Sequence, residues 1–174
     1  WTRRLHALPS RPGQPPRQSL FFRMIREGRV PLIGDGNAPR SMVYIHNLCD
    51  GLVLAATHEN AVSETFWIAD EHPYSMNEIV ETIRNVMRTS FGIVCSNRCI
   101  QLPDITGILA TYVDAAIQAL GFYSQKIHVL SEMNKTIACD ISKARARLNY
   151  QPRVSLHEGM YRSLLWMQEH GIAW

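Results

Sequence analysis

The stretch from Gly34 to Gly51, GDGNAPRSMVYIHNLCDG, decides how the middle of this chain folds. Asp-Gly is a strong turn dipeptide because glycine adopts positive φ without a Cβ clash, so a tight turn is expected at Gly34–Gly36. A short strand is expected over Met42–Ile45. A helix should follow, beginning at His46 or Asn47, with Asn47 as a suitable N-cap.

This order places one guanidinium, that of Arg40, beside a flexible loop, a strand and a helix start. Arginine can meet a phosphate with two parallel hydrogen bonds, so the arrangement suits the binding of an anion. The alternative interpretation is a solvated loop arginine that binds nothing in particular.

Two blocks of sequence carry a resemblance to a known family. The first is the stretch above, with its GDG, RS, VYI and NLCDG elements. The second contains Cys139–Arg145 (CDISKAR), Leu148–Pro152 (LNYQP), Leu156–Met160 (LHEGM) and Trp166, and Phe66–Asp70 (FWIAD) supports both. Together they resemble the extended short-chain dehydrogenase/reductases, the NAD-dependent epimerase/dehydratase family that works largely on nucleotide-linked sugars. The likeness covers about residues 19 to 172.

The resemblance implies a mixed α/β fold of helices around a few short strands, the C-terminal substrate-binding portion of an extended Rossmann-type enzyme with the Rossmann half absent. It implies Arg40 as a phosphate anchor, with Leu32, Ile33 and Gly34 as the wall beside the nucleotide and Asn47 as a weaker polar contact. An edge strand with ordinary core contacts is the other interpretation of Leu32 and Ile33.

The family motifs that bind the dinucleotide and move the proton are not in this sequence. No G-x-x-G-x-x-G follows a strand, and no tyrosine is followed by lysine four residues later. The sequence therefore predicts no catalytic residues. NAD or NADP is expected to take a hydride in the intact enzyme, and this chain alone is expected to bind neither.

A second phosphate-binding arginine is common in the family in the region of Phe122–Thr136. This chain has only Lys126 and Lys135 there, which would act as point charges without bidentate geometry or as solvated lysines.

The composition bounds the class of protein. With 174 residues, 46% hydrophobic and 19% charged, the chain has the length and composition of one soluble globular domain. A net charge of +3 gives no argument for nucleic acid, and no apolar run reaches the length of a membrane span. The four cysteines form no C-x-x-C pair, so no metal site is expected and reduced thiols in the cytoplasm are the simple interpretation.

The chain divides into an irregular, basic and proline-rich leader (1–19) and a substrate-binding domain (20–174). It begins with Trp1, which indicates a processed product, a recombinant piece or a fragment of a longer protein.

The remaining elements are predicted from local signals. Helices are expected over 20–28, after the capping-box serines Ser75 and Ser155, and after Asp104 and Asp140, with a strand over Thr65–Ala69. Leu20, Phe21, Met24 and Ile25 should form the buried face of the first helix. The helix after Asp104 has a wide apolar stripe and should pack against something large. Asp140 and Lys143 are expected to be a helix cap and a surface lysine, not an acid/base pair.

Three functions are consistent with these observations. The first is part of a sugar-nucleotide epimerase or dehydratase, inactive alone, and the second is part of a hydroxysteroid-dehydrogenase-like enzyme for an apolar alcohol. The third is a non-catalytic binding or assembly module. A small-molecule substrate is expected, a nucleotide sugar above all, without nucleic acid or membrane partners, and a homo-oligomer is possible.

Overall fold

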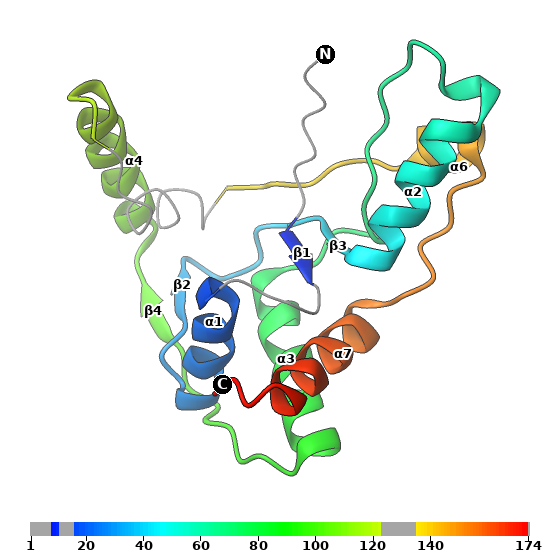
Figure 1. Cartoon of the computed structure of the whole chain (residues 1–174). Helices are drawn as coiled ribbons and strands as arrows, with labels where there is room; N and C mark the ends of the chain where they lie inside the picture. Colours follow the sequence, from blue (N-terminus) through cyan, green and yellow to red (C-terminus); the bar gives the residue numbers. More distant parts are fainter. Residues whose placement is uncertain (1–7, 11–15, 123–134, 174) are drawn as a thin grey trace.

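The protein is described by a computed structural model over residues 8–10, 16–122 and 135–173 (Figure 1). Its strands are β1 (Leu8–Ser10), β2 (Pro31–Ile33), β3 (Met42–Tyr44) and β4 (Ile100–Leu102). Its helices are α1 (Pro16–Glu27), α2 (Ile45–Thr57), α3 (Met76–Phe91), α4 (Asp104–Ala119), α6 (Ser142–Leu148) and α7 (Leu156–Glu169), with a 3₁₀ turn η1 (Glu59–Ala61). The predicted mixed α/β fold is confirmed.

The described strands form two parallel pairs. β1 pairs with β3, with Leu8 opposite Met42, and β2 pairs with β4, with Pro31 opposite Ile100. Parallel neighbours need a long crossover connection, and helices supply it here. α1 lies in the connection from β1 to β3, and α2 and α3 lie in the connection from β2 to β4.

The larger core lies between α3 and α7, with α1 packed against α3 (Figure 1). Both serine caps are confirmed, since Ser75 Oγ accepts from Glu78 N at 3.1 Å and Ser155 Oγ accepts from Glu158 N at 3.3 Å. These caps fix where the two helices begin, and the spacing of the apolar residues places one apolar stripe on each helix. The buried stripe residues are Ile79, Val80, Ile83, Val86 and Met87 of α3 and Leu156, Met160, Leu164 and Met167 of α7.

A second core joins α2, α6 and β3. Its buried members are Val43, Ile68, Ala69, Ile141, Ala144, Leu148 and Tyr150. Gly51 lets α2 approach this core closely, because a Cβ at that position would lie 2.7 Å from Cγ2 of Ile68. α6 ends at Leu148, and Asn149 after it has a left-handed φ of 51°, which asparagine tolerates at a helix end.

The structure differs from the sequence expectations at the start of the chain. The leader was expected to be irregular to residue 19, but Leu8–Ser10 forms β1 and α1 already begins at Pro16. Proline is compatible with a first helical turn because the missing N–H would have no intrahelical partner there. The buried face of α1 also centres on Phe22 and Ile25, while Leu20 is 46% exposed.

One further expectation is wrong. Thr65–Ala69 forms no strand, although Asp70 N donates to Met42 O at 2.7 Å at its end. A strand needs a ladder of backbone bonds to its neighbour, and within the described residues this segment is joined to β3 only by that bond at its end. Within the described residues the apolar stripe of α4 is exposed, so the large neighbour expected for it is not among them.

Among the described helices, none has the length and apolar content needed to cross a bilayer.

Candidate substrate-binding site

The turn before Arg40 is built on two glycines with positive φ. Gly34 has φ 65° and Gly36 has φ 71°, so the predicted turn is confirmed. Gly34 N donates to Leu102 O at 2.9 Å, which carries the β2–β4 pairing one residue into the turn. A Cβ on Gly34 would lie 2.2 Å from Oδ1 of Asp104, so the chain approaches the start of α4 closely at this point.

Asn77, near the start of α3, ties this turn to the body of the protein. Its Nδ2 donates to Asp35 O at 2.7 Å, and its backbone N donates to Gly36 O at 3.2 Å. The carboxylate of Asp35 accepts from Asn37 N at 2.9 Å and from Asn37 Nδ2 at 3.1 Å, and these bonds hold the pKa of Asp35 below its ordinary value. The loop that leads to Arg40 is therefore held by specific bonds and is not a flexible tether.

Arg40 lies where three segments of the chain meet. Its backbone N and O both bond to Tyr74, each at 2.8 Å. On the other side, Ile137 N donates to Pro39 O at 2.9 Å and Ser41 N donates to Ile137 O at 2.8 Å. Arg40 is only 9% exposed, so its side chain is not solvated as the alternative interpretation expected.

The two apolar residues predicted beside Arg40 are buried. Leu32 is 6% exposed and Ile33 is 4% exposed, and they pair with Gln101 and Leu102 of β4. Leu32 belongs to the larger core together with Tyr74, whose backbone makes two hydrogen bonds to the backbone of Arg40. The ordinary core contacts that the edge-strand interpretation expected are therefore present. The strand that carries Leu32 and Ile33 leads directly into the Gly34 turn.

Asn47 does not occupy the position predicted for it. α2 begins at Ile45, and Asn47 lies inside its first turn with 1% exposure. Its Nδ2 donates to Asp70 Oδ1 at 3.0 Å and to Val154 O at 2.8 Å. Its Oδ1 accepts from the backbone N of Arg153 and of Val154, each at 3.0 Å. This side chain joins three distant segments, so its contacts are structural.

Asp70 is a buried carboxyl that the sequence analysis did not single out. It is 4% exposed, and burial raises the pKa of its carboxyl to about 6. Hydrogen bonds from Asn47 and from the Tyr44 backbone oppose this rise because they stabilise the carboxylate. In the sequence Asp70 only follows the strand expected over Thr65–Ala69, and no local signal shows that its carboxyl meets Asn47 across the fold.

The tyrosines near this region are poorly suited to act as bases. Burial raises the pKa of Tyr74 to about 12, and it also raises the pKa of Tyr44 and Tyr150. A tyrosine base needs the opposite shift, which a nearby lysine supplies in the Tyr-x-x-x-Lys arrangement.

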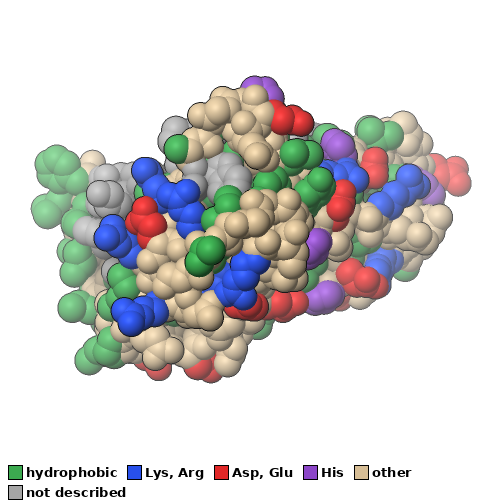
Figure 2. All heavy atoms as spheres, turned by 90° about the horizontal axis from the view of Figure 1, so that it is seen from below, with side chains coloured by type: hydrophobic (Ala, Val, Ile, Leu, Met, Phe, Trp, Pro, Cys, Tyr) green, Lys and Arg blue, Asp and Glu red, His purple; other side chains and the backbone are tan. Residues whose placement is uncertain are grey.

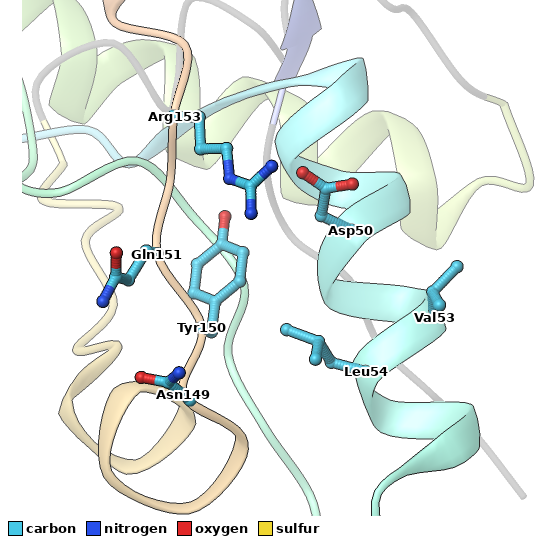
Figure 3. Close-up of a pocket in the computed structure, with 7 residues that line it drawn as sticks. All are labelled: Asp50, Val53, Leu54, Asn149, Tyr150, Gln151 and Arg153. Atoms are coloured by element: carbon cyan, nitrogen blue, oxygen red, sulfur yellow. The ribbon is translucent and has the colours of Figure 1, made fainter.

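A surface depression of ≈ 350 Å³ lies elsewhere, between α2 and the turn after α6 (Figure 3). It is lined by Asp50, Val53, Leu54, Asn149, Tyr150, Gln151 and Arg153. In Figure 3 the guanidinium of Arg153 points toward Asp50, above the Tyr150 hydroxyl. None of the predicted site residues lines this depression.

Asp140 and Lys143 bond to other partners and not to each other, although the N-cap of α6 is Ile141 and not Asp140 as expected. Asp140 Oδ1 accepts from Ser142 N at 2.8 Å at the start of α6. Lys143 Nζ pairs with Glu64 Oε2 at 2.7 Å and donates to Thr65 O at 3.0 Å. Over residues 8–10, 16–122 and 135–173, no group of three His, Cys, Asp or Glu side chains could hold a metal ion. Lys135 is exposed, and Lys126 lies outside the described residues.

Known proteins resemble this chain over most of its length, although no family model matches it. The uncharacterized protein y4nL of Sinorhizobium fredii is 54% identical over 92% of this chain and 45% of its own length. The 3beta-hydroxysteroid-dehydrogenase/decarboxylase isoform 1 of Arabidopsis thaliana is 27% identical over 76% of this chain and 32% of its own length. The UDP-glucuronic acid decarboxylase 1 of the same plant is 28% identical over 79% of this chain and 24% of its own length.

Solved structures share the fold. The dTDP-glucose 4,6-dehydratase of Bacillus anthracis, in complex with NAD, superposes with a TM-score of 0.62 at 17% identity, over 97% of this chain and 44% of that one. The UDP-glucose 4-epimerase of Thermotoga maritima, with UDP-glucose, gives a TM-score of 0.57 at 20% identity, over 88% and 40%.

The characterised relatives and the structural neighbours are members of the NAD-dependent epimerase/dehydratase family, the class of protein that the sequence resembles. This chain spans less than half the length of each of these proteins.

Proposed function

We propose that this chain is the substrate-binding part of an NAD(P)-dependent oxidoreductase of the sugar-nucleotide epimerase and dehydratase type, and that it is inactive by itself. The observation that carries the proposal is Arg40, a buried guanidinium fixed on a rigid backbone next to a glycine turn. Relatives and neighbours named for UDP-glucuronic acid and UDP-glucose support the nucleotide-sugar class.

The chemistry of the site follows from its position. A guanidinium shielded from water binds a phosphate more strongly than an exposed one does, because the local dielectric is low. The Asn77 bonds hold the preceding loop, so little entropy is lost when a phosphate binds. Leu32, Ile33 and Gly34 would form the apolar side of the site, next to a nucleotide base. Asn47 is left out of the proposed site because its amide is occupied within the chain.

In the intact enzyme the nicotinamide would accept a hydride from a substrate hydroxyl. The chain described here would contribute binding and orientation of the phosphate end, and the proton acceptor would come from the remaining part of the protein. NAD-bound neighbours of the same fold support NAD as the cofactor of the intact enzyme.

A second candidate is a hydroxysteroid-dehydrogenase-like enzyme for an apolar alcohol. Two observations favour it: the similarity to the hydroxysteroid-dehydrogenase/decarboxylase and the absence of arginine from residues 122–136. A non-catalytic binding module is a third candidate, because the sequence has no dinucleotide or catalytic motif.

Ligand-induced thermal shift separates these candidates. UDP should raise the melting temperature of the purified chain in a saturable way, while NADH at the same concentration should not. A shift with a 3β-hydroxysterol but not with UDP would favour the second candidate. No shift with any of the three probes would favour the non-catalytic module.

A further inference from the structure

Helix α4 is packed with its least apolar face inward. Its buried residues are Gly107, Ala110 and Asp114, which are small or polar. Its large apolar residues are exposed, and we refer to them as the α4 stripe: Ile105 (70%), Ile108 (53%), Leu109 (63%), Tyr112 (72%), Val113 (39%), Leu120 (74%) and Phe122 (71%). A helix normally buries its apolar face, so this orientation leaves an unusual surface.

The α4 stripe is one continuous surface. Its helical members recur at spacings of three and four residues, which places them on one side of the helix. Figure 1 shows α4 standing apart from the body formed by α1, α3 and α7. In Figure 2, hydrophobic side chains project along the edge of the molecule on which α4 lies in Figure 1.

The area of the stripe matches what a stable dimer needs. If each large apolar side chain offers about 200 Å² when fully exposed, the seven together expose roughly 900 Å² at the fractions above. A specific interface buries about 800 Å² on each partner, whereas exposed apolar patches on monomers rarely exceed a few hundred Å².

The charge pattern permits self-pairing. The only charged residues of α4 are Asp104 and Asp114, and Asp114 lies on the buried face. No charged side chain belongs to the stripe, so two copies could meet without like-charge repulsion. An antiparallel arrangement would also place opposite ends of the two helix dipoles together. An amphipathic helix on a membrane surface usually carries Lys and Arg, and α4 has neither.

We propose that the α4 stripe is a self-association surface on which a second copy of this chain packs its own α4. The two helices run antiparallel around a two-fold axis close to Tyr112, which lies near the middle of the stripe. Such an isologous contact buries the same patch on both copies and closes at a dimer.

Sedimentation equilibrium of the full chain over a concentration series tests this proposal. The wild-type chain should be a dimer, and Tyr112→Glu should raise the dissociation constant on the order of a hundredfold, because it places two carboxylates at the axis. Val94→Glu is the matched control, because Val94 is 91% exposed but lies in the loop after α3. Both sites are exposed, so circular dichroism should show unchanged folding.

A wild-type chain that stays monomeric would overturn the proposal, and so would open-ended association or a dimer that Tyr112→Glu does not weaken. Cross-linking gives a second, independent readout. In a Cys49→Ser background, which removes the exposed thiol, Tyr112→Cys should form a covalent dimer on mild oxidation and Val94→Cys should not. Equal cross-linking at both positions would contradict the assigned axis.

Discussion

The amide of Asn47 donates a 3.0 Å hydrogen bond to the buried carboxylate of Asp70, 23 residues further along the chain. The same amide also bonds the backbone of Arg153 and Val154, more than 100 residues away. One side chain thus fixes the start of α2 against two other segments, and α2 begins directly after β3, the strand that follows Arg40.

Replacing Asn47 with alanine should lower the free energy of unfolding by about 3 kcal/mol, because it leaves several buried polar groups without partners. Asn60→Ala is the control, because the exposed Asn60 amide makes a single 3.3 Å bond to Arg147 O. Urea unfolding measures both variants. Equal losses would show that the Asn47 bonds contribute little.

Asp70 should make stability depend on pH. Its pKa in the folded protein is about 6, above its ordinary 3.8, so folding favours the protonated acid. Its contribution to stability is present at low pH and is lost as pH rises toward and through about 6. The free energy of unfolding should therefore fall by roughly 1–1.5 kcal/mol between pH 5 and 7.5 from this group alone.

Unfolding of Asp70→Asn at pH 5 and pH 7.5 tests this dependence. The fall in the free energy of unfolding that wild type shows between these pH values should be absent from the variant. Asp140→Asn is the matched control. The pKa of Asp140 is lowered by its bonds to Ser142. The stability that Asp140 contributes is therefore lost only as pH falls below its ordinary pKa of 3.8, outside the range of this experiment. A wild-type slope that persists in Asp70→Asn would assign the titration to another group.

Gly51→Ala should destabilise the protein although alanine is the better helix former. The new Cβ would lie 2.7 Å from Cγ2 and 2.9 Å from Cδ1 of Ile68, which is itself buried in the second core. Overpacking of this kind costs about 1–3 kcal/mol. Ile68→Val removes Cδ1, so the double variant should lose less than the two single losses combined, as thermal unfolding can measure. Strict additivity would show that Cδ1 of Ile68 does not clash with the new Cβ.

The sequence predicted the elements whose signals are local. Ser75 and Ser155 cap their helices, and Asn149 ends α6, because these rules involve only residues a few positions apart. The Gly34–Gly36 turn was predicted for the same reason.

Features that depend on distant partners could not be predicted. Asparagine is a residue type that often caps helices, but Asn47 lies inside α2, where it bonds to Asp70 and Val154. The periodicity of α4 correctly predicts a helix with an apolar stripe, but periodicity alone does not say whether anything covers it. The burial of Arg40 likewise depends on Tyr74 and Ile137, which approach it only in the folded chain.

Calorimetric titration of UDP into the purified chain and into two arginine variants tests the central claim most directly. The account predicts saturable binding that Arg40→Gln weakens on the order of tenfold or more, since a charge-assisted bond to phosphate is lost. Arg153→Gln, in the separate surface depression, should bind as wild type does, and Arg40→Lys should retain part of the affinity. A folded wild-type chain that does not bind UDP, or a folded Arg40→Gln that binds it equally well, would contradict the assignment of Arg40 as a phosphate anchor.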